Sequence, residues 1–217
     1  MKCAIIVLLI LMPFILAAQN FQPGDHELFL MPTAYTMPKG NSYFSNYELV
    51  FLNYTFAPTP TTHIGAFTLF PITKDFVETF TFGAKQNYLK FNKFQGALWA
   101  TYTPKIKGIT IGNVFSIGKK SNSLHIGIGA ATADEASQWE LLYLIGYRKD
   151  VSKKVSLIAE YTNSQTLLEE ENFNGLISIG ARFRGGSVSW ELAGVRPLES
   201  TGDFLFFPLL KATIHID

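Results

Sequence analysis

The chain has 217 residues, of which 47% are hydrophobic, 14% are aromatic and only 16% are charged. Its 18 Lys and Arg residues nearly balance its 17 Asp and Glu residues, so it lacks the basic excess that binding to nucleic acid requires. The charged fraction is well below the roughly 25% of ordinary soluble domains, yet no stretch after residue 18 has the about 18 consecutive apolar residues of a transmembrane helix. These properties exclude a nucleic-acid-binding protein and disfavour a helical membrane protein.

The first 18 residues have the layout of a secretory signal peptide. Lys2 precedes an apolar run from Ala4 to Leu16, and the small residues Ala17 and Ala18 follow it. The run is too short to span a membrane as a helix. We therefore expect a signal peptide over residues 1–18 and a mature chain over residues 19–217, with a retained anchor helix as the alternative.

The mature chain is predicted to consist of strands with almost no helix. Twelve segments alternate apolar and polar residues and are separated by short stretches of Gly, Pro, Asn, Asp, Ser and Lys. Most approach the about 9 to 11 residues that a tilted strand needs to cross a bilayer. No linker divides them, which indicates one domain. The predicted strands span residues 27–36, 43–56, 62–70, 76–89, 93–103, 109–118, 123–133, 138–149, 154–162, 174–183, 187–196 and 204–216.

Each predicted strand has one apolar face and one face of small or polar residues. Leu141, Tyr143 and Ile145 share a face, for example, while Gly146 and Arg148 share the other. The pattern suits a soluble sandwich or barrel with its apolar face inside, or an outer-membrane barrel with that face toward lipid. Aromatic residues fall near strand ends, as the interfacial girdles of a membrane barrel require. We therefore predict an all-β, transmembrane, antiparallel up-and-down barrel of about twelve strands, with ten as the alternative.

The connections are consistent with this topology. With an even number of strands, both ends of the chain lie on the periplasmic side. The predicted periplasmic turns at 57–61, 90–92, 119–122, 149–153 and 184–186 are short. The longest connection, at 163–173, contains the acidic run Glu169–Glu171 and is predicted to lie outside the cell.

The leader, the even strand count and the final amphipathic segment Lys211–Asp217 resemble those of Gram-negative outer-membrane β-barrel proteins. The segment Met31–Gly40, followed by Tyr43–Glu48, is similar to the start of a group of uncharacterised small barrels. The chain departs from the usual pattern at its last residue, which is Asp217 and not Phe. The resemblance implies a location in the bacterial outer membrane, with membrane lipids and the barrel-assembly machinery as partners, and it implies no particular activity.

The alternation also predicts which polar residues line the lumen. Their mixed signs allow either a water-filled channel or paired charges that seal the interior. On adjacent strands, Glu160, Arg182 and Glu191 can pair if their heights match. The predicted lumen-lining residues are Glu48, Lys85, His125, Glu140, Arg148, Glu160, Arg182, Glu191 and Lys211.

The leading functional hypothesis is a small pore or passive conduit for small solutes, with a narrow polar lumen. The alternative is a non-conducting structural or interaction barrel that works through its surface loops. The absence of a recognisable N-terminal plug domain, which is common in dedicated transporters, favours this alternative.

An outer-membrane enzyme is the third and weakest hypothesis. His125 with the nearby Ser121 and Ser123 is the best candidate for nucleophilic chemistry, but these residues are predicted to lie on the lumen face near a periplasmic turn, away from lipid acyl chains. The only cysteine, Cys3, lies in the leader, and the histidines are too far apart in sequence to suggest a metal site. We therefore expect no enzymatic activity, no cofactor and no metal.

Overall fold

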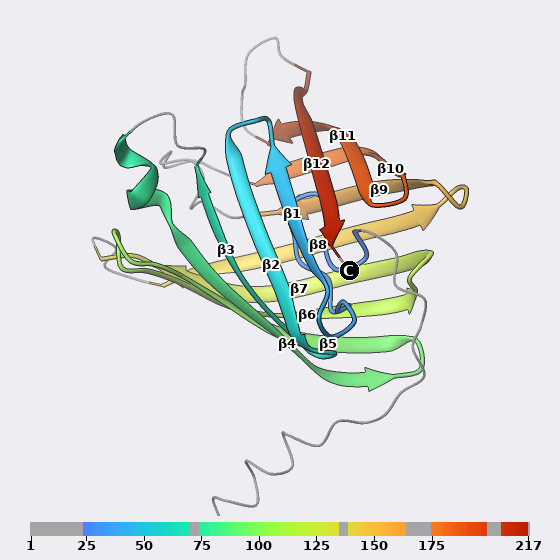
Figure 1. The fold of residues 1–217 in the computed structure, drawn as a ribbon, viewed down its shortest axis with the longest axis horizontal. Helices are drawn as coiled ribbons and strands as arrows, with labels where there is room; N and C mark the ends of the chain where they lie inside the picture. Colours follow the sequence, from blue (N-terminus) through green and yellow to red (C-terminus); the bar gives the residue numbers. More distant parts are fainter. Residues whose placement is uncertain (1–23, 70–73, 135–138, 164–174, 199–204, 217) are drawn as a thin grey trace, which may run out of the picture.

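The computed structural model describes residues 24–69, 74–134, 139–163, 175–198 and 205–216, which form a closed antiparallel β-barrel of twelve strands (Figure 1). Each strand pairs with its neighbours in sequence, and β1 pairs with β12 to close the barrel. The predicted fold class is thereby confirmed. The strands are β1 (Ser42–Tyr47), β2 (Phe51–Thr59), β3 (Thr62–Leu69), β4 (Thr81–Phe91), β5 (Phe94–Thr103), β6 (Gly108–Lys119), β7 (Asn122–Thr132), β8 (Glu140–Asp150), β9 (Val155–Thr162), β10 (Leu176–Arg184), β11 (Val188–Pro197) and β12 (Phe207–Ile216).

Helical structure is minor in the described part of the chain. A single 3-10 helix, η1 (Lys74–Thr79), lies between β3 and β4. Among the residues that the structure describes, no helix is long and apolar enough to cross a membrane. The predicted signal peptide lies outside the described residues.

The two ends of the barrel differ in the length of their connections. The segments 60–61, 92–93, 120–121, 151–154 and 185–187 join strands at one end, which also holds the end of β12 and which we call the short-turn end. At the other end, called here the long-connection end, the connections at 48–50 and 104–107 are short, and those at 70–80, 133–139, 163–175 and 198–206 are longer. This asymmetry agrees with the predicted division of the turns.

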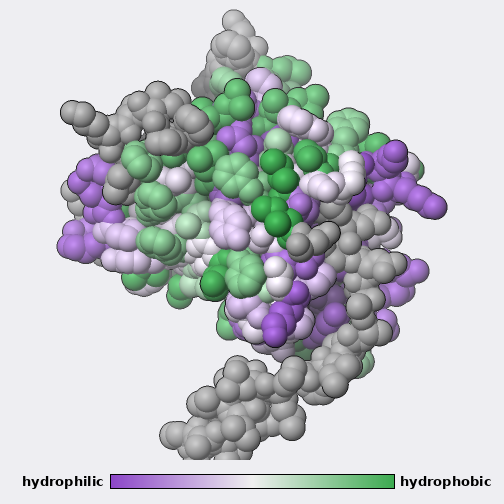
Figure 2. All heavy atoms as spheres, viewed as in Figure 1, coloured by the Kyte–Doolittle hydropathy of each residue, from purple (hydrophilic) through white to green (hydrophobic). Residues whose placement is uncertain are grey.

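The apolar faces of the strands point outward. Leu141 and Ile145 on β8 are each 50% exposed, whereas their neighbour Leu142 is only 4% exposed. On the face seen in Figure 2, hydrophobic residues spread across the strands and hydrophilic residues gather toward the edges. The outside of the barrel is thus apolar, which is the reverse of a soluble barrel.

The first predicted strand, at 27–36, is wrong. Residues 24–37 pass inside the barrel, and the exposed residues 38–40 then lead to β1, which begins at Ser42 (Figure 1). Leu28 and Phe29 are consecutive and both fully buried, which the alternating environment of a wall strand does not allow. Pro32 also lacks the N–H group that a ladder would use. The segment therefore fills the lumen and does not contribute to the wall.

The second predicted strand, at 43–56, is also wrong, because it consists of two strands, β1 and β2. They are joined by a tight turn in which Glu48 (φ 53°) and Leu49 (φ 59°) both have positive φ angles. Such a turn matches the twist of an antiparallel hairpin. The side chain of Asn46 accepts a hydrogen bond from the Leu49 N–H (2.9 Å) and stabilises it. The predicted total of twelve is correct because this missed strand replaces the strand expected at 27–36.

Candidate functional site

The N-terminal part of the described chain forms a small hairpin inside the barrel. The Leu28 N–H donates to the carbonyl of Met31 (2.9 Å), and the Thr33 N–H donates to the carbonyl of His26 (3.2 Å). We call residues 26–33 the lumen hairpin. Lys120, in a short turn, contacts Asp25 just before it, and Thr36 just after it donates to the carbonyl of Pro60 in another short turn (2.7 Å). The chain therefore enters and leaves the lumen at the short-turn end.

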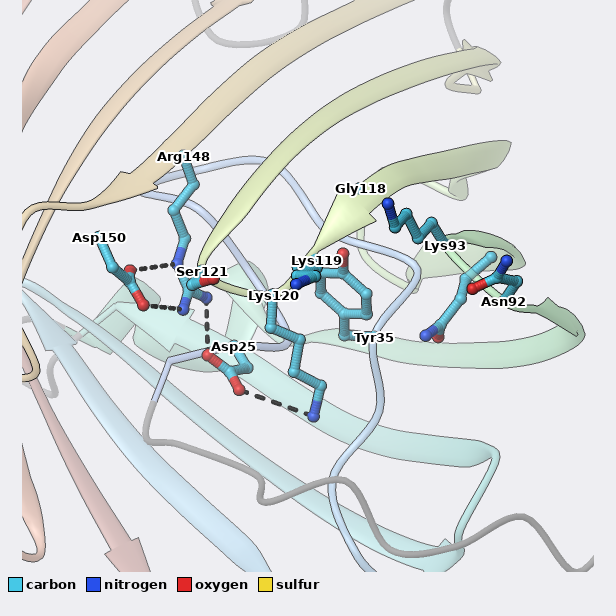
Figure 3. Close-up of a pocket in the computed structure, with 11 residues that line it drawn as sticks. Asp25, Tyr35, Asn92, Lys93, Gly118, Lys119, Lys120, Ser121, Arg148 and Asp150 are labelled. Atoms are coloured by element: carbon cyan, nitrogen blue, oxygen red, sulfur yellow. Dashed lines mark hydrogen bonds and ion pairs between the residues drawn. The ribbon is translucent and has the colours of Figure 1, made fainter.

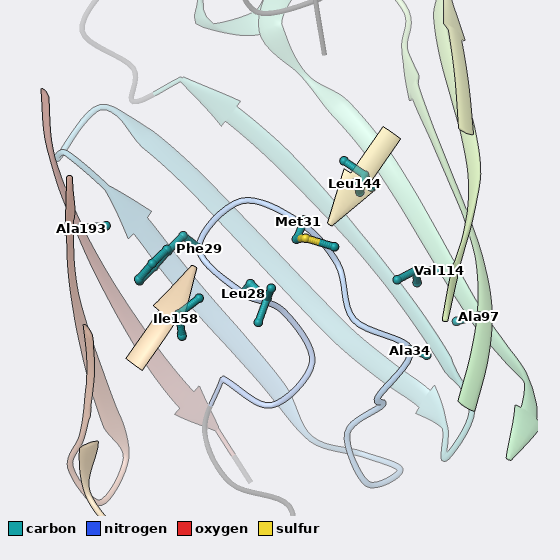
Figure 4. Close-up of a cluster of buried hydrophobic side chains, with 9 residues drawn as sticks. All are labelled: Leu28, Phe29, Met31, Ala34, Ala97, Val114, Leu144, Ile158 and Ala193. Carbon is teal, nitrogen blue, oxygen red and sulfur yellow. The ribbon is translucent and has the colours of Figure 1, made fainter. Parts of the chain in front are cut away.

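Apolar side chains of the hairpin pack against the inner wall. Leu28, Phe29 and Met31 are all buried, in a cluster that includes Ile158 and Leu144 of the wall (Figure 4). The absence of a side chain at one wall position makes room for them. A Cβ atom added at Gly146 would overlap Cδ1 of Leu28 and lie 2.6 Å from Sδ of Met31. This wall glycine therefore accommodates the hairpin.

Arg182 donates hydrogen bonds to the start of the hairpin and to the residue just before Asp25. It is fully buried, and its Nε donates to Oε1 of Glu191 (2.8 Å), which lies opposite it on β11. Its Nη2 donates to the carbonyls of Glu27 (2.9 Å) and Leu28 (3.0 Å), and its Nη1 donates to the carbonyl of Gly24. A guanidinium group has its donors fixed in one plane, so this single side chain joins the wall to three backbone carbonyls.

Lys85 binds both arms of the hairpin where they lie side by side. Its Nζ donates to the carbonyls of His26 (2.8 Å), Thr33 (3.0 Å) and Tyr35 (2.9 Å). These three bonds use all the donors of an ammonium group. Close by, Asn87 donates to the carbonyl of Ala34 (2.6 Å). The returning arm is therefore held by β4 through backbone carbonyls.

The tip of the hairpin is held by charges of both signs. The carboxylate of Glu160 accepts hydrogen bonds from the N–H groups of Leu30 (2.9 Å) and Met31 (3.3 Å). Lys211 lies 2.6 Å from Oε1 of Glu27 and donates to the carbonyl of Phe29 (3.3 Å). Glu160 lies opposite Ser178 in the register of β9 and β10. It is therefore not at the height of the Arg182–Glu191 pair and binds the hairpin instead.

Ion pairs fix the start of the segment at the short-turn end. Asp25 lies between Arg148 (2.6 Å) and Lys120 (3.6 Å), and Arg148 also contacts Asp150 (3.2 Å), as Figure 3 shows. These groups line a cavity of about 420 Å³. Asp25 and Arg148 are almost fully buried, where a charge is tolerated only with a partner. The N-terminal segment thus supplies carboxylates to cations of the wall.

Two wall histidines also anchor this segment. His125 is fully buried between Ser116 (2.7 Å from Nδ1) and Ser123 (2.9 Å from Nε2), and Ser116 accepts a hydrogen bond from the Ala34 N–H (2.8 Å). His63 accepts a hydrogen bond from the Met37 N–H (2.8 Å) through Nε2. Ser116 and Ser123 are thus within hydrogen-bonding distance of the His125 ring, whereas Ser121, which was also predicted near it, lies in the turn between β6 and β7.

His26, in the hairpin itself, is uncharged at neutral pH. Burial is the main cause, and it lowers the pKa of the imidazole from 6.5 to about 4, although the carboxylate of Glu27, 3.3 Å away, raises it. The ring packs against Tyr43, with ring centroids 4.0 Å apart. At neutral pH the hairpin therefore places a neutral imidazole among the buried charges of the lumen.

The structure places the nine predicted lumen residues in two groups. Glu48 lies in the exposed turn between β1 and β2, and Glu140 is exposed at the start of β8. The other seven are enclosed by the barrel, and each contacts the N-terminal segment directly or through a wall side chain: Lys85, His125, Arg148, Glu160, Arg182, Glu191 and Lys211.

Sequence reasoning missed the N-terminal partners of these residues. Among the seven enclosed residues, Lys85, Arg148, Arg182 and Lys211 are cations, but only two are carboxylates. A buried excess of cations requires acceptors from another part of the chain. The apolar run from residue 28 to residue 31, followed by Pro32, was the available signal that a non-strand segment supplies them.

A second cavity extends along the side of the hairpin, where His26 and Lys85 line it, and beyond its tip. It has a volume of about 650 Å³, and its floor includes Leu30 and Met31. It extends toward the long-connection end, where Glu48 and Phe51 line it. We call it the vestibule. Within the described residues, no group of three or more His, Cys, Asp or Glu side chains is placed to hold a metal ion.

No protein-family model and no curated protein matches the sequence. Among solved structures, Acinetobacter baumannii OccAB3 is similar with a TM-score of 0.40 and 9% identity over 76% of this chain and 54% of that chain. Acinetobacter baumannii OccAB2 is similar with a TM-score of 0.34 and 11% identity, over 76% and 53%. The chain thus spans about half the length of these two proteins.

Proposed function

We propose that this protein is an integral outer-membrane barrel of the channel type that is closed at rest by its lumen hairpin. Small solutes would pass only when the hairpin leaves the lumen. The observation that carries the proposal is the direct hydrogen bonding of Lys85, Glu160, Arg182 and Lys211 to the hairpin backbone. The proposed conduit is therefore gated, whereas the sequence alone favoured a passive pore.

The outer surface of the barrel supports a membrane location. Large apolar side chains on many strands are about half exposed, among them Ile126, Ile145, Leu157 and Ile179. Such an apolar surface is stable only against lipid or another apolar partner. We propose outer-membrane lipids as that partner and insertion by the barrel-assembly machinery as the route to the membrane.

The chemistry of the lumen is compatible with both a closed and an open state. With the hairpin in place, the buried wall charges are paired with its backbone and carboxylates. If the hairpin leaves, water can enter and solvate these charges, as it does in polar channel interiors. Displacement of the hairpin therefore need not leave bare charges in an apolar medium.

We propose an anchoring role for His125, Ser116 and Ser123 and no enzymatic activity. Both ring nitrogens of His125 lie within hydrogen-bonding distance of a serine hydroxyl, and Ser116 holds the Ala34 N–H. All three residues are almost fully buried. A hydrolytic nucleophile needs access to its substrate, which the N-terminal segment blocks at this point.

The conductance of single proteins in planar bilayers tests the gate. The double variant Arg182→Gln/Glu191→Gln removes the charged donor bonds to the carbonyls of Gly24, Glu27 and Leu28, and it removes both charges of the Arg182–Glu191 pair together. We expect the native protein to remain closed and this variant to show discrete openings. Glu78→Gln/Lys105→Gln is the matched control, because this 2.7 Å pair is exposed, and it should remain closed.

Two outcomes would count against the gate. A native protein with a steady open level that the double variant leaves unchanged would show that the hairpin does not close the lumen. If neither protein ever conducts although proteolysis shows that the hairpin of the variant is released, the barrel is a non-conducting structural or interaction protein.

A further inference from the structure

The vestibule has the size and lining of a small-molecule site. Its volume of about 650 Å³ falls within the roughly 300 to 1,000 Å³ typical of ligand pockets. Apolar side chains from opposite parts of the barrel line it, including Phe51, Phe67, Leu142 and Leu209. Leu30 and Met31 of the hairpin form part of its floor. The site therefore combines an apolar wall with a fixed inner end.

Gly83 leaves a hollow in the wall at this position. Gly65 on β3 lies opposite Gly83 on β4, and both line the vestibule. A Cβ atom added at Gly83 would meet only Thr101 Cγ2 at 3.6 Å and the carbonyl of Ala100 at 3.8 Å. A side chain would fit there in ordinary van der Waals contact. The hollow at Gly83 is therefore open space, not a close approach of two strands.

The charged groups at the floor already have partners in the protein. Glu160 accepts two N–H groups of the hairpin tip, and Lys85 donates to three carbonyls. Glu27, which also lines the floor, is paired with Lys211. An ionic ligand would bring a charge into this site without a counter-charge available for it, which is costly in an apolar environment. The site favours uncharged ligands.

From this geometry we infer that the vestibule binds an uncharged, predominantly apolar small molecule, such as an alkyl or aryl compound whose polar group is at most a hydroxyl. The apolar body would lie against the aromatic and aliphatic wall and fill the hollow beside Gly83. The site lies on the long-connection side of the hairpin. The inference is therefore independent of whether the barrel conducts.

One tryptophan provides a built-in reporter. Trp99 lines the vestibule, and its ring lies over Gly112, where an added Cβ atom would be 2.6 Å from the indole carbons. The other two tryptophans of the chain, Trp139 and Trp190, are 54% and 52% exposed. In the variant Trp139→Phe/Trp190→Phe, indole fluorescence therefore reports on the vestibule alone.

Quenching by 11-bromoundecan-1-ol, whose bromine quenches indole on contact, tests the inference in full-length protein held in lipid nanodiscs. We expect saturable quenching of Trp99 fluorescence. Adding Gly83→Phe, which fills the hollow, should abolish the saturable component. Adding Leu98→Phe should leave it unchanged, because Leu98 on β5 is 53% exposed on the outer face and does not line the vestibule. The anionic 11-bromoundecanoate should bind on the order of tenfold more weakly or worse.

The folded state of each variant is checked by its heat-modifiable migration in gels. If Gly83→Phe does not fold, Thr110→Phe takes its place, since Thr110 lines the same cavity. Quenching that rises linearly and equally in all variants would overturn the inference, because it would reflect partition into the lipid only. Tighter binding of the carboxylate than of the alcohol would overturn the assigned ligand class.

Discussion

Individual wall residues bind the hairpin mainly through its backbone. Lys85 contacts three carbonyls, and Arg182 contacts three more. Hydrogen bonds to a charged group contribute about 1.5 to 3 kcal/mol each, and a buried donor left without an acceptor costs a similar amount. Removal of the hairpin from a dry lumen would therefore be strongly unfavourable, whereas entry of water would offset much of the loss.

Glu160→Gln should loosen the tip of the hairpin. The amide retains one acceptor oxygen, so the N–H groups of Leu30 and Met31 would share a neutral acceptor in place of a carboxylate. We expect a loss on the order of 1.5 to 3 kcal/mol in local stability, or roughly ten- to a hundredfold faster hydrogen exchange at these two amides. Mass spectrometry of the hairpin peptide measures it. Glu78→Gln, which changes an exposed carboxylate, is the control, and equal exchange in both variants would contradict the assigned role of Glu160.

The sequence predicts which side chains point into the barrel better than it predicts which groups those side chains contact. Alternation along β10 and β11 is enough to place Arg182 and Glu191 on the inner face, and the register then brings them opposite each other. The position of Glu160 along the barrel depends on the register between β9 and β10. Alternation of apolar and polar residues predicts the face of a strand but not this register. The carbonyl acceptors of Lys85 belong to a segment distant in sequence. They could not be predicted from the pattern of its own strand.

Two elements at the start of the barrel show where pattern reasoning fails. Residues 27–36 are apolar enough for a strand, but the consecutive buried residues Leu28 and Phe29 require an environment that is buried on all sides. Glu48 and Leu49 form a turn without the Gly, Asn or Asp residues that normally mark positive φ angles. The strand predicted at 76–89 begins too early, because its first residues belong to η1 and β4 begins at Thr81. The strands after β4 alternate cleanly, and their predicted bounds lie within about three residues of the observed ones.

The outward-facing side chains of the strands predict where a cation would hinder assembly of the barrel. Ile126 on β7 is 43% exposed on the outer face. A cation on a lipid-facing site costs about 2 to 4 kcal/mol at the bilayer midplane. Ile126→Arg should therefore reduce assembly into lipid vesicles and lower the urea concentration at which the barrel unfolds.

Thr110→Arg is the matched control for this substitution, since Thr110 on β6 lines the vestibule. The same side chain there can reach water in the vestibule and should be tolerated better. Equal damage at both positions would show that the outer face is not in contact with lipid. Recovery of the native protein as a soluble monomer without detergent would contradict the membrane location itself.

In the whole barrel, closure of the sheet pairs the strand edges, and the lumen hairpin fills part of the interior. Pairing of β1 with β12 removes the free strand edges that would otherwise invite aggregation. The closed barrel has an interior that the side chains of the wall do not fill along its whole length. The lumen hairpin occupies the part toward the short-turn end, while the vestibule remains hollow beyond its tip.

The central claim is that the hairpin lies in the lumen and closes it, and a disulfide bond between hairpin and wall tests this most directly. An added Cβ at Gly146 would overlap Cδ1 of Leu28. That atom is two bonds from Leu28 Cβ, so Leu28→Cys/Gly146→Cys should bring two thiols close to the span of a disulfide. Cys3, the only native cysteine, lies in the predicted leader and is replaced by Ser.

The measurement is bilayer conductance of Leu28→Cys/Gly146→Cys combined with Arg182→Gln/Glu191→Gln, first oxidised and then reduced. Leu28→Cys/Gly83→Cys in the same background is the control, because Gly83 faces the vestibule and an added Cβ there would not meet the hairpin. We expect the disulfide to form only in the first protein, to hold it closed, and to restore its openings when reduced. A folded barrel that forms no disulfide, or that conducts equally in the oxidised and reduced states, would contradict the account.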